Sequence, residues 1–139
     1  MAGFKKPERI FLKKDISNLF EKGEKWSVFP FRVSLLFVDG LNSEFPASVL
    51  FSVSKRNFKN ATDRNRLKRQ MREAYRLKKE DFFKSIKCLS SESLNHTVHI
   101  GFIYTSRKKE PWLMFEKKMN MALNEIIVKL NLYLEKNHA

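Results

Sequence analysis

Residues 51–76, FSVSKRNFKNATDRNRLKRQMREAYR, carry the end of a strand-like segment, a short loop and a strongly basic helical pattern. Within residues 61–76, six of the sixteen side chains are Arg or Lys, yet an apolar rhythm persists between them. At 100° per residue, four apolar side chains of this run fall on one face of a helix. The sequence therefore predicts a helix with a cationic surface and a buried stripe, formed by Leu67, Met71, Ala74 and Tyr75.

The charge of this helix is not balanced by its own acids. Only Asp63 and Glu73 accompany the six cations, so at least 6 − 2 = 4 cations have no acidic partner in the run. Like charges three or four residues apart destabilise a helix by roughly 0.2–0.5 kcal/mol per pair. Because Arg makes planar, bidentate contacts to phosphate, we expect a polyanion to neutralise this surface. The side opposite the stripe carries Asn65, Arg69, Arg72 and Arg76, with Arg64, Arg66 and Lys68 towards its edges.

Two other interpretations of the basic helix stay open. It can be a solvated surface, as most charged runs are, although the excess of Arg over acids disfavours that. It can also be the reading helix of a helix-turn-helix domain, but strand-like segments rather than a second short helix flank it.

The composition is that of a folded, strongly basic chain. Its 139 residues suit one domain, 1–139, with about residues 1–8 and 136–139 expected to be flexible. Lys and Arg total 28 against 15 Asp and Glu, so the formal net charge is +13, which indicates an anionic partner such as nucleic acid. Cys88 is the only cysteine, so no intrachain disulfide can form. We expect a cytoplasmic protein, because the sequence shows neither a secretory signal nor an apolar run of about 20 residues.

Hydrophobic periodicity predicts helices and strands along the rest of the chain. Helices are expected at 13–22, 61–83 and 111–135, and strands within 26–40 (with a break near Pro30), 45–55 and 98–106. The last strand is nearly apolar throughout, which is typical of a central strand. The short loop before residue 46 predicts that its two flanking strands form an antiparallel pair. The strand–helix–strand run through 47–105 predicts a parallel pair, and residues 84–97 are expected to be a polar connection. This order indicates an α+β fold with one layer of sheet and helices packed on it.

Residues 51–76 closely resemble the signature of the bacterial ribonuclease P protein subunit. That signature is a strand ending in Ser-Val-Ser-Lys, a short loop, and Arg-Asn-Arg-x-Lys-Arg-x-x-Arg on a helix. Lys55 matches the lysine after the strand, and Ala61 matches the small residue before the helix. Four N-terminal positions fit the family's spacing: Arg9, Leu12, Phe20 and Gly23. The helical motif is matched by Arg64, Asn65, Arg66, Lys68, Arg69 and Arg72.

The resemblance implies a fold and a function. The family folds as α-β-β-β-α-β-α, like ribosomal protein S5 domain 2, with a left-handed βαβ crossover through the basic helix, against the usual right-handed rule. Its members are small, non-catalytic partners of a catalytic RNA that removes the 5′ leader from precursor tRNA. The resemblance therefore implies ribonuclease P RNA and precursor tRNA as partners and a monomeric free protein. It also implies Mg²⁺ that is bound mainly by the RNA and the substrate.

The same resemblance assigns two surfaces. RNA binding is expected at Arg64, Asn65, Arg66, Lys68, Arg69, Arg72 and Arg76, together with Lys55 and Arg56. A cleft for the leader strand is expected at Phe20, Phe31, Arg32, Ser52 and Ser54, where an aromatic ring could stack on an unpaired base. Two positions depart from the family. Ile16 stands where an aromatic residue is frequent, and Lys59 stands where glycine is common, so this loop is expected to follow a different path.

Other chemistry finds less support in the sequence. His96, His99 and His138 have no metal-ligand spacing with Cys88, and His99 is expected to be an ordinary strand residue. A second basic cluster at residues 107–109 is either solvated or part of an RNA footprint. A protein-only nuclease would need a carboxylate or histidine cluster that the sequence does not show. The rival functions are a general structured-RNA-binding or ribosome-associated protein without a catalytic partner, and a DNA-binding regulator.

Overall fold

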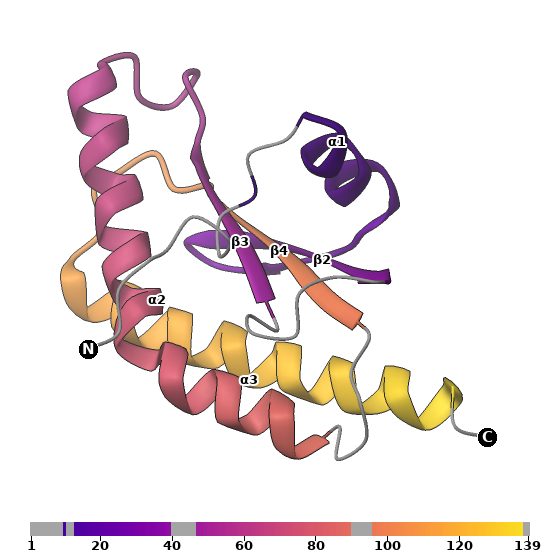
Figure 1. Cartoon of the computed structure of the whole chain (residues 1–139). Helices are drawn as coiled ribbons and strands as arrows, with labels where there is room; N and C mark the ends of the chain where they lie inside the picture. The colour runs from indigo at the N-terminus through magenta and orange to yellow at the C-terminus, as the bar shows by residue number, and fades with distance from the viewer. Residues whose placement is uncertain (1–9, 11–12, 40–46, 90–95, 138–139) are drawn as a thin grey trace.

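The computed structural model describes residues 10, 13–39, 47–89 and 96–137, which form a four-stranded sheet with helices on both faces (Figure 1). The helices α2 and α3 cover one face of the sheet, and the shorter α1 lies on the other (Figure 1). The order is the expected α-β-β-β-α-β-α. The elements are α1 (Lys13–Lys22), β1 (Glu24–Val28), β2 (Phe31–Asp39), β3 (Ala47–Val53), α2 (Ala61–Leu89), β4 (His96–Tyr104) and α3 (Trp112–Asn137).

The strand order in the sheet is β1-β2-β4-β3. β1 and β2 form an antiparallel hairpin, β4 pairs antiparallel with β2, and β3 pairs parallel with β4. The parallel pair and the central position of β4 confirm the predictions. The predicted antiparallel pairing of β2 with β3 is wrong, because β4 lies between them. β4 fits the central place because Val98, Ile100, Phe102 and Tyr104 are buried on one face and His99 and Gly101 on the other, whereas β3 places serines on its outer face.

The core lies between the sheet and the helices α2 and α3. The predicted stripe of α2 is buried there, with Leu67 1%, Met71 0%, Ala74 1% and Tyr75 0% exposed. Aromatic rings fill much of this layer, and those of Phe51 and Phe102 stack with centroids 5.7 Å apart. Burial of this stripe is what holds the cationic side of α2 outward.

Two helices run further than the sequence predicted. α2 continues to Leu89 instead of ending near residue 83, because Phe82 and Ile86 are buried in the same core cluster. Residues 84–89 are therefore helical rather than connecting, and residues 90–95 lie outside the described part. α3 continues to Asn137, two residues beyond its predicted end, while residues 1–8 are not described.

α3 is attached to the edge of the sheet by polar and aromatic contacts. The indole Nε1 of Trp26 donates to Glu125 Oε2 at 2.7 Å, and Lys129 forms an ion pair with Glu24 at 2.8 Å. The rings of Phe37 and Tyr133 stack with centroids 3.6 Å apart. None of the helices in the described part is long and apolar enough to cross a membrane.

α1 packs on the opposite face of the sheet through Leu19, which is fully buried. It ends at Lys22, and the N–H of Gly23 donates to the Leu19 carbonyl at 3.0 Å, as expected for a glycine that ends a helix. Gly101 of β4 lies directly under α1. A Cβ there would stand 3.1 Å from Leu19 Cδ2 and 3.5 Å from Phe20 Cε1, so the absence of a side chain allows α1 to lie close to the sheet.

Candidate nucleic-acid interface

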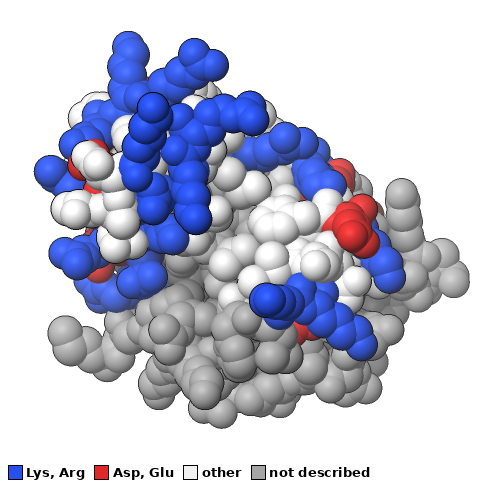
Figure 2. Space-filling view, turned by 90° about the horizontal axis from the view of Figure 1, so that it is seen from above, with Lys and Arg blue, Asp and Glu red and all other residues white. Residues whose placement is uncertain are grey.

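The outward side of α2 carries exposed cations and an amide. Asn65, Arg66, Arg69 and Arg72 are exposed, and Lys68 is half-buried. Figure 2 shows Lys and Arg gathered on one side of the molecule, in the region where α2 begins. Their arrangement follows directly from the burial of the opposite stripe, and Arg69 makes no hydrogen bond or ion pair with any residue of the described part. This surface can therefore offer guanidinium groups to phosphate oxygens.

Arg76 and Arg64, both predicted to bind RNA, have partners within the protein. Arg76 forms a bidentate ion pair with Glu73, at 2.6 Å and 2.9 Å. The Arg76 hydrogen bonds hold the pKa of the Glu73 carboxyl below its usual value, and the same pair raises the pKa of Arg76. Arg64 donates through one guanidinium nitrogen to the carbonyls of Phe58 at 2.7 Å and Lys59 at 2.8 Å. Arg64 thus ties the preceding loop to the first turn of α2, a role that the sequence prediction missed.

The loop at residues 54–60 is ordered by short-range bonds and one buried ring. The N–H of Phe58 donates to the Ser54 carbonyl at 3.1 Å, and the N–H of Arg56 donates to Ser54 Oγ at 3.1 Å. Phe58 is 8% exposed and anchors the loop to the core. Lys55 and Arg56 consequently project from a fixed turn and are both exposed, as the RNA-binding prediction requires. Ser54, predicted in the leader cleft, uses its polar atoms inside this turn.

A second basic loop, at residues 105–111, lies beside the start of α2. The hydroxyl of Tyr104 donates to the Lys108 carbonyl at 2.6 Å and accepts from the Glu110 N–H at 2.9 Å. Burial raises the pKa of Tyr104, so this hydroxyl stays protonated and able to donate. Arg107 and Lys108 are exposed on the surface of the loop. The sequence showed the basic cluster but gave no sign of the tyrosine that shapes it.

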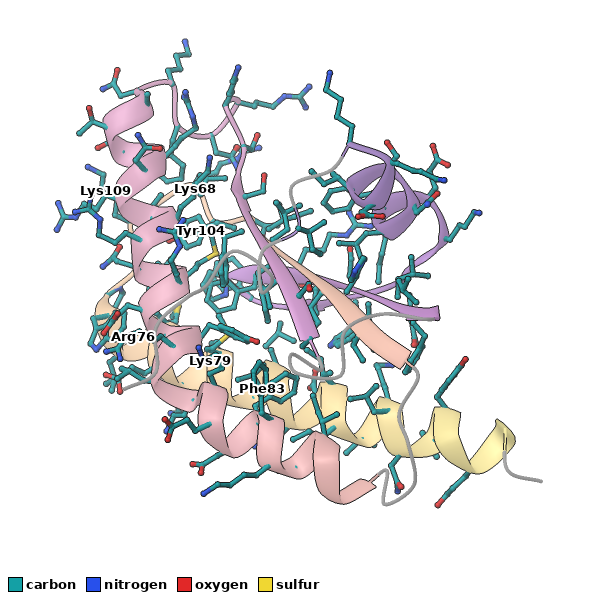
Figure 3. The ribbon with its side chains drawn as sticks, viewed as in Figure 1. Lys68, Arg76, Lys79, Phe83, Tyr104 and Lys109 are labelled. Carbon is teal, nitrogen blue, oxygen red and sulfur yellow. The ribbon has the colours of Figure 1, made fainter. Side chains whose placement is uncertain are left out.

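The ion pair between Asp63 and Lys109 joins the second basic loop to α2. Lys109 Nζ lies 2.8 Å from Asp63 Oδ1, and Figure 3 shows Lys109 beside the first turns of the helix. Lys109 is the main cause that lowers the pKa of Asp63, with smaller contributions from Asn60 and Arg66. The Asp63–Lys109 pair thus joins the two basic segments into one surface.

The uncovered part of the sheet lies on the same face as α1. Arg32, Ile103 and Ser52 stand opposite one another on β2, β4 and β3, and they form one row across this face. Arg32 is exposed and Ser52 is half-buried, as a surface for a single strand requires. Phe20 is half-buried at the edge of α1, and Ile16 is half-buried on the same helix.

Phe31 does not belong to this surface. Its ring is fully buried on the helix-covered face and packs edge-on against Phe102 and Phe115, with centroids 6.2 Å and 5.7 Å away. The prediction that Phe31 could stack on a base is therefore wrong. Side chains alternate along a strand, so the exposure of Arg32 on one face already places Phe31 on the other.

His99 lies on the α1 face, where it is 4% exposed, and its Nδ1 has no hydrogen-bond partner in the described part of the protein. Burial lowers its pKa, and Asp15 on α1 opposes that effect. The described residues contain no group of three or more His, Cys, Asp or Glu side chains that could hold a metal ion.

Comparison with known proteins assigns the chain to a family. The family model described as Ribonuclease P matches residues 4–124. The chain belongs to the ribonuclease P protein family. The matched residues include both basic segments, the uncovered row of the sheet and the first half of α3.

Curated relatives and solved structures agree with this assignment. The ribonuclease P protein component of Porphyromonas gingivalis is 45% identical over 80 residues, which are 55% of this chain and 56% of the relative. That of Chlorobaculum tepidum is 42% identical over 62 residues, which are 45% of this chain and 40% of the relative. The chain thus spans about half the length of the relatives it matches.

The solved ribonuclease P protein of Staphylococcus aureus superimposes with a TM-score of 0.58 and 22% identity. It covers 86% of this chain and 94% of its own. The Thermotoga maritima protein gives a TM-score of 0.50 at 22% identity, over 89% of this chain and 96% of its own. At this level of identity these likenesses establish the ribonuclease P protein fold.

Proposed function

We propose that this chain is the protein subunit of ribonuclease P and that it binds the catalytic RNA through the outward side of α2. The observation that supports this most strongly is the exposed row of Asn65, Arg66, Arg69 and Arg72 in a member of this family. These side chains are held outward by a buried stripe and can reach several phosphates of one folded RNA. Affinity of this kind falls steeply as salt rises.

The uncovered face of the sheet is the proposed site for the 5′ leader of precursor tRNA. Phe20 offers a half-exposed ring, and Arg32 offers an exposed guanidinium beside the row formed with Ile103 and Ser52. An unpaired strand can stack its bases on such a ring and place its phosphates near the cations, with little preference for sequence. This division gives the catalytic RNA and the leader separate surfaces on one small protein.

The bond cleavage itself belongs, in this proposal, to the RNA. Mg²⁺ would be held mainly by the RNA and the substrate, and the protein would act by positioning and by charge neutralisation. Its cations lower the repulsion between two polyanions, so less Mg²⁺ is needed to bring them together. The cytoplasm is the proposed place of action.

Reconstitution with a bacterial ribonuclease P RNA tests the proposal. Precursor tRNA cleavage is measured at low Mg²⁺, where the RNA alone works poorly, with and without the protein. We expect the protein to restore cleavage at the mature 5′ end. An Arg66→Gln, Arg69→Gln double variant should lose most of this gain, while Lys84→Gln with Lys117→Gln serves as a control that removes two exposed charges elsewhere. The proposal fails if the unaltered protein gives no gain.

A general structured-RNA-binding or ribosome-associated function is the second candidate, because a net charge of +13 would suit any folded RNA. It predicts similar affinity for unrelated structured RNAs and no preference for precursor over mature tRNA. A competition experiment with ribonuclease P RNA and an unrelated RNA of equal length distinguishes the two functions.

A further inference from the structure

Three connecting segments meet at one end of the sheet, beside the start of α2 (Figure 1). Phe31 of β2, Tyr104 of β4 and Val53 of β3 stand opposite one another, so the segments that adjoin them lie at the same end. We call this end the loop edge. It comprises the turn at Phe29–Pro30, the loop at residues 54–60 and the loop at residues 105–111.

The loop edge is held together by bonds between its segments. The N–H of Thr105 donates to the Pro30 carbonyl at 2.8 Å, and its hydroxyl donates to the same oxygen at 3.1 Å. Asn57 Nδ2 lies 3.5 Å from the Thr105 carbonyl. The rings of Phe58 and Tyr104 lie 6.0 Å apart beneath the loops. Because all three segments are fixed to the end of β4, their exposed side chains keep a defined arrangement.

Phe29 is the aromatic member of this arrangement. It is 53% exposed, although its neighbours Val28 and Pro30 are both buried. Within the described residues it is the one aromatic side chain among the large apolar side chains that are clearly exposed. An isolated exposed apolar side chain is common on protein surfaces, so exposure by itself assigns no role. The feature that bears on function is its place on the same end of the sheet as two basic loops.

The two loops that share the loop edge with Phe29 carry exposed cations. Lys55 and Arg56 are exposed on one loop, and Arg107 and Lys108 on the other. The acids nearby are engaged, because Asp63 pairs with Lys109 at 2.8 Å and Glu110 accepts from Ser106 Oγ at 3.0 Å. Adjacent strands are about 4.8 Å apart, so the turn and the two loops span a strip roughly 10 Å wide. An aromatic ring beside a cationic track is the arrangement that binds an unpaired nucleic-acid strand.

We propose that Phe29 stacks on an unpaired base of the 5′ leader and that the loop edge continues the leader path beyond the sheet. The inference rests on the proposed function. It is based on the position of the row formed by Arg32, Ile103 and Ser52 on the uncovered face. This row is one residue along the strands from Phe31, Tyr104 and Val53, which adjoin the loop edge. In this proposal the leader crosses this face from Phe20, and its nucleotides further from the cleavage site lie against Phe29. Phe29 in this way takes over stacking that Ile16 cannot supply on α1.

The test measures binding of precursor tRNA to the reconstituted holoenzyme for a series of leader lengths. Phe29→Ala should weaken binding of long-leader precursor by roughly fivefold to 150-fold, which corresponds to about 1–3 kcal/mol for one stacked base. A leader of one or two nucleotides, and mature tRNA, should bind equally well to both proteins. Phe29→Trp should keep or strengthen the binding of the long leader.

The controls separate stacking from damage to the protein. Leu132→Ala removes a side chain of matched exposure, 52%, at the far end of α3 and should change no affinity. Thermal unfolding should show that Phe29→Ala leaves the fold intact. The inference is overturned if Phe29→Ala binds long leaders normally, or if it weakens mature tRNA equally, which would place the ring against another RNA surface. If the unaltered holoenzyme itself shows no preference for a leader, the proposed leader function fails instead.

Discussion

Arg64 sets the path of the loop before α2 through two hydrogen bonds to backbone carbonyls, those of Phe58 and Lys59. Arg76 is balanced by Glu73 at 2.6 Å, and Arg69 points outward with no partner in the described part of the chain. These three arginines of α2 thus have different roles: Arg64 binds backbone carbonyls, Arg76 pairs with an acid, and Arg69 faces outward. A phosphate that contacts Arg64 or Arg76 shares the guanidinium with a protein acceptor, whereas one that contacts Arg69 does not.

We expect Arg64→Ala to lower both stability and RNA affinity, and Arg69→Ala to lower RNA affinity alone. Loss of the two carbonyl contacts should cost about 1–3 kcal/mol of unfolding free energy, because hydrogen bonds from charged groups contribute that order of magnitude. The expected fall in melting temperature is several degrees for a domain of this size. Thermal unfolding and RNA binding, measured on both variants, check this.

Arg64→Lys is the matched control, since it keeps the charge but loses the planar fork that reaches both carbonyls. It should recover part of the RNA affinity and less of the stability. Equal melting temperatures for Arg64→Ala and Arg69→Ala would contradict the structural role.

The burial of a single residue was predictable where the regular spacing of apolar residues in a helix or strand determines which side of the element is buried. The stripe from Leu67 to Tyr75 follows from helical spacing alone, and its burial is confirmed. Phe31 was misassigned although the alternation of β2 held the signal, because Val33 and Leu35 share its face while Arg32 faces away. The bonds of Arg64 could not be foreseen, since they depend on the path of a loop that spacing does not determine.

At the scale of elements, the sequence located each helix and strand but not the neighbours of every strand. A short connection suggested that β2 and β3 form a hairpin. The pairing is instead decided by β4, which is apolar enough to be covered on both faces and so takes the position between them. The length of α2 was similarly underestimated, because burial of Phe82 and Ile86 depends on α3, which is distant in sequence.

The contact between α1 and the sheet should be sensitive to volume at Gly101. Gly101→Val should push α1 outward, because even a Cβ would stand 3.1 Å from Leu19 Cδ2 and 3.5 Å from Phe20 Cε1. Forcing extra carbons into a packed site typically costs about 1–3 kcal/mol. Since Phe20 moves with α1, binding of leader-bearing precursor should weaken more than binding of mature tRNA. Chemical denaturation and holoenzyme binding measure the two effects.

Gly101→Ala is a milder form of the same change, because one added carbon requires Leu19 to move by only a few tenths of an ångström. Its losses should therefore be smaller than those of Gly101→Val in both measurements. A Gly101→Val protein that loses stability but keeps full preference for the leader would show that Phe20 is not part of the leader surface.

At the scale of the whole molecule, the excess positive charge is concentrated on one side rather than evenly distributed. Several acids are committed to local partners: Glu24 to Lys129, Asp63 to Lys109 and Glu73 to Arg76. The exposed cations without such partners then dominate the side where α2 begins (Figure 2). Counterions condensed on an RNA are released when these cations bind, which makes the association depend on salt.

The slope of RNA affinity against salt concentration should therefore depend on which charges are removed. Replacing Arg66 and Arg69 with Gln should reduce the slope of log K against log salt for ribonuclease P RNA by about 1.4–1.8, the value for two lost phosphate contacts. Replacing Lys84 and Lys117 with Gln removes the same formal charge from the other half of α2 and from α3, and should change the slope far less. Titration of the RNA at four or more salt concentrations measures both slopes. Equal reductions in the two variants would mean that net charge, and not the outward side of α2, governs binding.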